Sequence, residues 1–156
     1  MKKVLIVEDE ILARLGLRQL VDWRKLELEL LPDATDGEEA LEMIRNSCPD
    51  IILLDLNIPK VSGLEILEFL KKEEMPTKVI VVSCQEEFDV VKKAMKLGAY
   101  DYLRKLNLSS DELENILEKC LGETEERNKV HMQGIREIRY EEIVRDSRDI
   151  LAGACN

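Results

Sequence analysis

The apolar residues of this chain gather in short runs that have the composition of buried β-strands. Residues 4–7, 51–54 and 79–82 are continuous aliphatic runs, and a weaker run covers residues 99–103. Uninterrupted runs of this kind are typical of parallel strands that helices cover on both faces. Residues 27–32 instead alternate polar and apolar side chains and include a proline, which predicts a strand at the edge of the sheet.

Between these runs, apolar residues recur at the spacing of amphipathic helices. The spacing predicts four helices, over residues 10–21, 38–46, 64–70 and 88–95. Gly98 can end the last of them in a left-handed conformation. Because strands that alternate with helices form a parallel sheet through right-handed crossovers, the pattern predicts an α/β, doubly wound fold.

The chain changes character near residue 122. Ser109 and Glu112 have the spacing of a helix capping box and precede apolar residues at helical spacing, which predicts a fifth helix. Residues 123–156 are mostly charged, and their thinly spread apolar side chains keep no strict heptad. We therefore expect one globular domain over residues 1–122 and a charged helical linker or tail over residues 123–156.

The composition indicates a soluble, cytoplasmic protein. The formal net charge of -10 argues against nonspecific binding of nucleic acid or of anionic membranes. The first residues lack the apolar stretch of a signal peptide, and no run approaches the roughly 18 residues of a membrane span. The four cysteines are widely spaced, which favours free thiols in a reducing cytoplasm, and a single histidine leaves little for a zinc site. These residues are Cys48, Cys84, Cys120, Cys155 and His131.

Polar and ionisable side chains follow the predicted strands where these emerge from the sheet. Glu8 and Asp9 follow the first apolar run, and Asp55 closes the run at residues 51–54. Ser83 and Lys105 follow the last two runs. In open α/β sheets, ligands bind beyond the carboxyl ends of the strands. We therefore expect these acids, the hydroxyl group and the ammonium group to meet at one edge of the sheet.

The order of these elements resembles the receiver domain of two-component response regulators, over residues 2–122. Two sequences carry the resemblance together with the polar strand ends. They are Leu-Asp-Leu-Asn-Ile-Pro-Lys-Val-Ser-Gly-Leu-Glu at residues 54–65 and Leu-Gly-Ala-Tyr-Asp-Tyr-Leu at residues 97–103. The resemblance implies a flavodoxin-like sheet of five parallel strands in the order 2-1-3-4-5, with five helices.

The resemblance also implies that Asp55 accepts a phosphoryl group. A carboxylate can hold such a group as an acyl phosphate when the charge on the phosphoryl oxygens is neutralised. Mg²⁺ would do this, since it prefers oxygen ligands. Its ligands would come from Glu8, Asp9, Asp55 and the backbone carbonyl group of Asn57.

Ser83, Lys105 and Tyr102 would respond to that group. The Lys105 ammonium would neutralise one phosphoryl oxygen as a compact point charge, and the Ser83 hydroxyl would donate a hydrogen bond. The resemblance implies that this bond draws in the loop after Ser83 and that Tyr102 changes its rotamer. The switch follows from the charge and the acceptors that phosphorylation adds to the site.

Two positions depart from the family pattern. Most receivers have a proline after the lysine, usually in a cis peptide, whereas Leu106 follows Lys105 here. The bond is then either trans with a rearranged loop, or cis with retained strain. Cys84 is larger than the very small residue that normally follows the hydroxyl, so we expect slow phosphorylation or dephosphorylation.

These features favour a signalling domain and not an enzyme with turnover. A sensor histidine kinase would supply the phosphoryl group, and the fourth helix, fifth strand and fifth helix would then form a homodimer. The sequences around Asp55 and Tyr102 resemble the subgroup with arabinose-regulator-type helix-turn-helix output domains. We therefore expect control of transcription through an output domain, with no direct nucleic-acid binding by this chain.

Two other functions stay open. A pseudo-receiver would bind a partner without being phosphorylated, which the departures at Leu106 and Cys84 make plausible. A magnesium-dependent phosphatase of the haloacid-dehalogenase type would also use a strand-end aspartate. Its motif needs a second aspartate as general acid two residues later, where this chain has Asn57.

Overall fold

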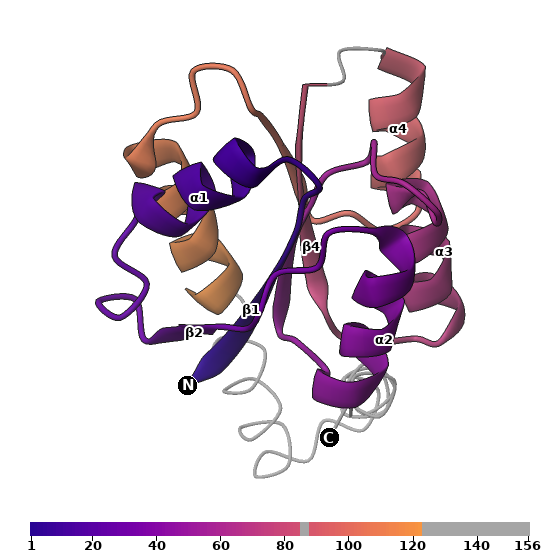
Figure 1. Ribbon diagram of the computed structural model, residues 1–156, viewed down its shortest axis with the longest axis horizontal. Coiled ribbons are helices and arrows are strands. Elements are labelled where there is room, and N and C mark those ends of the chain that lie inside the picture. The colour runs from indigo at the N-terminus through magenta and orange to yellow at the C-terminus, as the bar shows by residue number, and fades with distance from the viewer. Residues whose placement is uncertain (85–87, 123–156) are drawn as a thin grey trace, which may run out of the picture.

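The structure, a computed structural model, describes residues 1–84 and 88–122 (Figure 1). The predicted tail over residues 123–156, with His131 and Cys155, lies outside the described residues. In the described part of the chain, no helix is both long and apolar enough to cross a membrane.

A five-stranded parallel sheet forms the centre of the protein (Figure 1). Its strand order, β2-β1-β3-β4-β5, confirms the flavodoxin-like fold that the resemblance implied. Every pair of neighbouring strands is parallel, so the carboxyl ends of all five lie at one edge of the sheet. The strands are β1 (Lys2–Val7), β2 (Leu28–Leu30), β3 (Ile51–Leu54), β4 (Lys78–Ser83) and β5 (Asp101–Arg104).

Helices cover both faces of the sheet (Figure 1). Side chains alternate between the faces along each strand. In β1, Leu5 and Val7 join the core under α2, α3 and α4, and Val4 and Ile6 join the core under α1 and the fifth helix. This burial on both faces confirms the prediction of parallel strands. The helices are α1 (Ile11–Leu20), α2 (Gly37–Ser47), α3 (Gly63–Lys72), α4 (Phe88–Lys96) and a fifth helix over residues 110–122.

The weaker strands differ slightly from the sequence pattern. β2 is three residues long and lies at the edge of the sheet, as predicted, and Pro32 follows it. β5 begins at Asp101 and not at Ala99, because the Ala99 N–H bonds the Ala94 carbonyl in the turn that ends α4. Gly98 in that turn has φ of 102°, which confirms the predicted left-handed end.

The loop between β3 and α3 is fixed at its far end. Ser62 and Glu65 form a complete capping box at the start of α3. The Gly37 N–H donates to the Pro59 carbonyl at 3.1 Å, which ties the loop to α2. A Cβ atom at Gly37 would lie 1.9 Å from the Val61 carbonyl oxygen, so this close approach requires glycine.

The fifth helix packs firmly on the sheet. The Ser109 hydroxyl accepts a hydrogen bond from the Glu112 N–H at 3.1 Å, which is the serine half of the predicted capping box. Leu113 and Leu117 are fully buried against the strands. The fifth helix and α1 therefore cover one face of the sheet, as α2, α3 and α4 cover the other.

Candidate functional site

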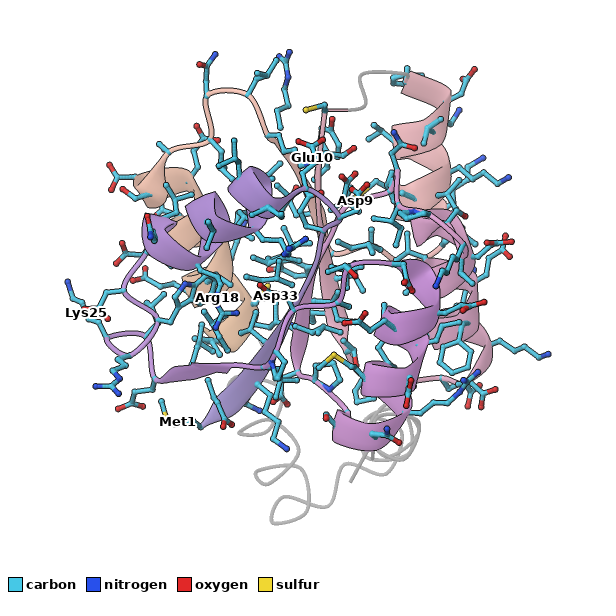
Figure 2. The ribbon with its side chains drawn as sticks, in the orientation of Figure 1. Met1, Asp9, Glu10, Arg18, Lys25 and Asp33 are labelled. Atoms are coloured by element: carbon cyan, nitrogen blue, oxygen red, sulfur yellow. The ribbon has the colours of Figure 1, made fainter. Side chains whose placement is uncertain are left out.

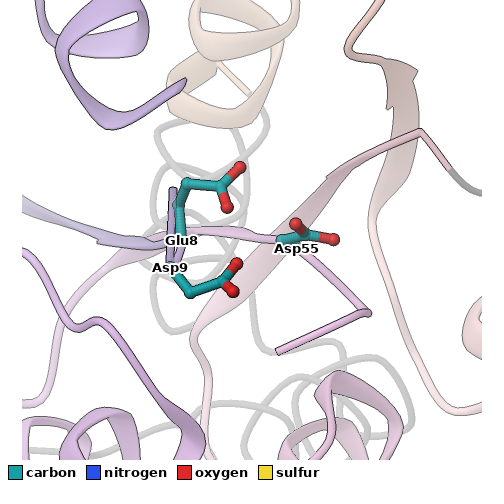
Figure 3. Close-up of side chains that lie close together, drawn as sticks. All are labelled: Glu8, Asp9 and Asp55. Atoms are coloured by element: carbon teal, nitrogen blue, oxygen red, sulfur yellow. The ribbon is translucent and has the colours of Figure 1, made fainter. Parts of the chain in front are cut away.

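The carboxyl edge of the sheet gathers the polar residues that end four of its strands. Glu8 and Asp9 follow β1, and Asp55 follows β3. Ser83 is the last residue of β4, and Lys105 follows β5. Because β3 lies between β1 and β4, the parallel register brings these residues together. Figure 3 shows the three carboxylates gathered at the strand ends.

Asp55 is nearly buried, with 5% of its surface exposed, and both carboxylate oxygens have partners. Oδ1 accepts hydrogen bonds from the Ser83 hydroxyl at 3.2 Å and from the Asn57 backbone N–H at 3.0 Å. Oδ2 accepts one from the Lys105 ammonium at 2.8 Å. The Asp55 N–H donates to the Val7 carbonyl at 3.0 Å. Asp55 therefore presents its carboxylate at the edge of the sheet in a fixed orientation.

Three carboxylates share this edge. One carboxylate oxygen from each of Glu8, Asp9 and Asp55 lies within 4.8 Å of the others. Glu8 is 1% exposed, whereas Asp9 faces solvent. Lys105 forms ion pairs with both Glu8 and Asp55 and offsets part of their charge. The site therefore concentrates negative charge that one ammonium group balances only in part.

The donor set fits a hard divalent cation. Glu8 Oε1 is buried and, apart from the Lys105 ammonium, meets no hydrogen-bond donor among the described residues. Mg²⁺ prefers carboxylate and carbonyl oxygens and keeps several water ligands, which the exposed side of Asp9 allows. Asn57 lies beside the carboxylates through its N–H bond to Asp55, and the role of its carbonyl group stays a prediction.

Burial and ion pairing shift the pKa of two residues in the site. Burial raises the pKa of the Glu8 carboxyl, and the Asp55 charge adds to this, against hydrogen bonds from Lys105 and from the Glu10 N–H. For Lys105, burial acts to lower the pKa, but the hydrogen bonds and charges of Asp55 and Glu8 outweigh it and raise the pKa. Lys105 is therefore charged at neutral pH, and ionising Glu8 costs free energy that a bound cation would offset.

Ser83 links the acidic site to Tyr102. The Tyr102 hydroxyl donates to the Ser83 carbonyl oxygen at 3.4 Å, and the Lys105 N–H donates to the same oxygen at 3.2 Å. An open pocket of about 340 Å³ lies beside Tyr102. The pocket is lined by Phe88, Val91, Tyr102 and Arg104. The rotamer change of Tyr102 stays a prediction.

The structure resolves one of the two departures from the family pattern. The Lys105–Leu106 peptide bond is trans, and the loop turns at Asn107, which has φ of 62°. The loop still places the Lys105 ammonium against Asp55. Cys84 is exposed and is a free thiol, as predicted, whereas Cys48 is disulfide-bonded, so the prediction of free thiols was wrong for that residue. The effect of Cys84 on phosphorylation stays a prediction.

Arg14 also belongs to this edge, although the sequence pattern placed it only among the residues of a helix. Its Nη1 donates to the backbone carbonyl oxygens of Glu8 and Asp9, at 3.0 Å each. The available signal was a cation one turn into a helix that directly follows an acidic pair. Residue types alone do not reveal a contact to backbone carbonyl groups.

Known proteins resemble this chain over its globular part. Residues 4–118 match the family model described as response regulator receiver domain. An uncharacterized response regulatory protein of Staphylococcus epidermidis is 33% identical over 118 residues, or 76% of this chain and 46% of that protein. The nitrate/nitrite response regulator protein NarL of Escherichia coli is 32% identical over 120 residues, or 77% of this chain and 55% of NarL. The chain thus spans about half the length of these relatives.

A solved structure has the same fold. The REC domain of AraT, a response regulator from Geobacillus stearothermophilus, has a TM-score of 0.75 and 30% sequence identity with this chain. The match covers 81% of this chain and 98% of that domain.

Proposed function

Because this chain belongs to the family of response regulator receiver domains, we propose that Asp55 accepts a phosphoryl group and that this modification switches a signalling surface. The observation that carries the proposal is the setting of Asp55. Its carboxylate lies at a strand end, within hydrogen-bond distance of the Ser83 hydroxyl and the Lys105 ammonium. Glu8 and Asp9 lie beside it with their charges only partly balanced.

In the proposed step, a carboxylate oxygen of Asp55 is the nucleophile. It forms a bond to phosphorus while the bond from phosphorus to the donor's histidine nitrogen breaks, and that electron pair stays on the imidazole. Lys105 would exchange its carboxylate contacts for an oxygen of the incoming group. The Ser83 hydroxyl would turn from Asp55 to another of these oxygens. Both side chains already contact Asp55, so each shift is short.

Mg²⁺ is the proposed cofactor of this step. Glu8, Asp9 and Asp55 would hold it, with the Asn57 carbonyl group as a further ligand. When bound, the cation would neutralise charge on the phosphoryl oxygens. Burial raises the pKa of the Glu8 carboxyl even with Lys105 beside it, and a bound cation would offset the cost of ionising this buried group.

A sensor histidine kinase is the proposed phosphoryl donor. Ile11, Leu12 and Leu15 are exposed on α1, which begins directly after the acidic segment. Leu106, which follows Lys105, is exposed as well. Exposed apolar side chains grouped in this way are typical of surfaces that contact another protein. These exposed apolar side chains support a protein as the phosphoryl donor, since a small phosphorylated molecule would not need such a surface.

The proposed output face consists of α4, β5 and the fifth helix. Tyr102 connects it to the site through the Ser83 carbonyl oxygen. We expect phosphorylated chains to form a homodimer through this face. In a longer protein, the dimer would control transcription through an output domain, for which the arabinose-regulator-type helix-turn-helix is our candidate. The greater length of the curated relatives supports the presence of further domains in such proteins.

Acetyl phosphate and Mg²⁺ provide the test. Intact mass spectrometry should find one added phosphoryl group on the parent chain and none on Asp55→Asn. Asp50→Asn is the matched control, because Asp50 precedes the same strand at the opposite edge of the sheet, and it should be phosphorylated like the parent. Phosphorylation of Asp55→Asn at the parent level would contradict the proposal.

The two other functions predict different results. A pseudo-receiver would show neither phosphorylation nor a change in oligomeric size with Mg²⁺ and beryllofluoride. A phosphatase of the haloacid-dehalogenase type would turn over a phosphomonoester steadily, a role against which Asn57 argues because its amide cannot serve as the general acid.

A further inference from the structure

Arg14 binds the backbone of both acidic residues that follow β1. Its Nη1 lies 3.0 Å from the carbonyl oxygen of Glu8 and 3.0 Å from that of Asp9. One guanidinium nitrogen on α1 thus holds two successive peptide groups. These are the residues whose carboxylates form the acidic cluster with Asp55.

The Glu8 peptide groups are held on both sides. The Glu8 N–H donates to the Ala34 carbonyl at 3.0 Å, and its own carbonyl oxygen accepts from Arg14. Its carboxylate Oε2 accepts from the Glu10 N–H at 3.2 Å. Without Arg14, the carbonyl side of this segment would lose its hydrogen bond at the point where the strand ladder ends.

Asp33 holds Arg14 from the other side. The Asp33 carboxylate lies 3.9 Å from Arg14 Nε and 2.7 Å from Arg18 Nη1. Figure 2 shows Asp33 and Arg18 side by side. The Arg14 and Asp33 side chains are only 18% and 16% exposed, so solvent screens this pair less than an exposed ion pair. The segment after β2 therefore places a carboxylate beside the guanidinium that binds the backbone of Glu8 and Asp9.

We infer that Arg14 is a positioning residue for divalent-cation binding at Glu8 and Asp9. The orientation of a peptide group sets the direction of the neighbouring Cα–Cβ bonds, and hence where each carboxylate points. Outer groups that orient metal ligands typically change affinity by about 10–100-fold when removed. The inference rests on the proposed cation role of Glu8 and Asp9. Arg14 touches neither the cation nor the phosphoryl group in this arrangement.

Calorimetric titration of the full chain with Mg²⁺ alone tests the inference. Arg14→Met keeps the aliphatic stem and removes the hydrogen-bond donors. Its Kd for Mg²⁺ should be about tenfold higher than that of the parent. Arg14→Lys keeps the charge with fewer donors, so its Kd should fall between those of the parent and Arg14→Met.

Arg18→Met is the matched control. Arg18 contacts Asp33 and the Leu31 carbonyl oxygen, and no contact joins it to Glu8 or Asp9. Its midpoint of thermal unfolding without Mg²⁺ should fall as much as that of Arg14→Met, while its Kd stays within about twofold of the parent.

The outcomes separate this inference from the proposed function. A parent-like Kd for Arg14→Met, with a lowered midpoint of thermal unfolding, would give Arg14 a structural role only and overturn the inference. If Arg14→Met does not fold, a parent-like Kd for Arg14→Lys would overturn it equally. If the parent binds no Mg²⁺, or if Asp9→Asn binds it as tightly as the parent, the proposed cation site itself fails, and the inference with it.

Discussion

The two ends of β3 carry aspartates in opposite surroundings. Asp50 at the amino end accepts the Lys3 N–H at 2.7 Å and lies 3.9 Å from the Lys2 ammonium, with 41% of its side chain exposed. Asp55 at the carboxyl end is 5% exposed and shares the Lys105 ammonium with Glu8. One carboxylate is solvated and caps the sheet, and the other lies among like charges.

The two edges of the sheet differ in what their charged groups contribute to the free energy of unfolding. At the amino edge, the hydrogen bond of Asp50 stabilises modestly and the exposed ion pair contributes little. At the carboxyl edge, the buried Glu8 carboxyl has a raised pKa, so its charge destabilises the folded protein without a cation. Substitutions at the two edges should therefore differ in size, and for the acids also in sign.

Lys105→Met should give the largest loss of stability. Methionine keeps an apolar stem but leaves the Glu8 and Asp55 charges uncompensated. We expect the free energy of unfolding to fall by about 2 kcal/mol, below the usual cost for a fully buried pair because the site is open to solvent at Asp9. Lys2→Met at the amino edge should change it by less than about 0.5 kcal/mol. Urea denaturation without Mg²⁺ measures both, and equal losses would break the comparison.

Glu8→Gln and Asp50→Asn should change stability in opposite directions. Removing the buried Glu8 charge should raise the free energy of unfolding of the Mg²⁺-free protein by about 1 kcal/mol. The variant protein should in turn gain no stability when Mg²⁺ is added. Asp50→Asn should lower that free energy by about 0.5–1 kcal/mol, because the Lys3 N–H then meets a neutral acceptor. Denaturation with and without Mg²⁺ gives both signs. If Glu8→Gln lowers the free energy of unfolding without Mg²⁺, the Glu8 charge does not destabilise the folded protein, and the account of this edge is wrong.

The pH dependence of stability should show the same asymmetry. Since the pKa of Glu8 is raised on folding, the folded protein keeps a proton that the unfolded chain has lost, and stability falls as pH rises through this window. The window opens near the unfolded-state pKa of about 4.3 and closes above the raised pKa of Glu8. Without Mg²⁺, the stability advantage of Glu8→Gln over the parent should therefore grow with pH across it. An advantage that does not vary with pH would contradict the shift.

Cys84→Ala should have the smallest effect and should act on rate alone. Cys84 follows Ser83 at the carboxyl edge and is exposed, so its replacement should leave the free energy of unfolding nearly unchanged. The smaller side chain should speed phosphorylation by acetyl phosphate severalfold, and Cys84→Val should slow it. Stopped assays of phosphorylated protein over time measure both rates, and equal rates in all three proteins would show that the size of this residue does not matter.

The fold and the acidic cluster could be predicted because their signals are local. Asp55 directly follows the uninterrupted apolar run at residues 51–54. Asp9 is the second residue after the apolar run at residues 4–7. Once such runs are assigned to parallel strands, the ends of neighbouring strands must meet at one edge of the sheet. The same reasoning placed the alternating segment that contains Leu28 at the edge.

The remaining features depend on geometry that residue types do not encode. The contact of Arg14 with the Glu8 carbonyl depends on the angle at which α1 leaves β1. The backbone of Lys105 is held by a hydrogen bond from its N–H to the Ser83 carbonyl oxygen, which the sequence does not reveal. The sequence also did not decide whether the peptide bond after Lys105 is cis or trans. β5 begins two residues later than predicted, because the Ala99 N–H bonds the Ala94 carbonyl in the turn that ends α4.

The most direct test of the proposed function identifies the aspartate that carries the phosphoryl group. After incubation with acetyl phosphate and Mg²⁺, borohydride reduces an aspartyl phosphate to homoserine, which peptide mass spectrometry can locate. We predict conversion of Asp55 to homoserine, with Asp9 and Asp50 unchanged. Conversion of Asp9 or Asp50, or an unmodified Asp55 in the folded protein, would contradict the role of Asp55 as phosphoryl acceptor.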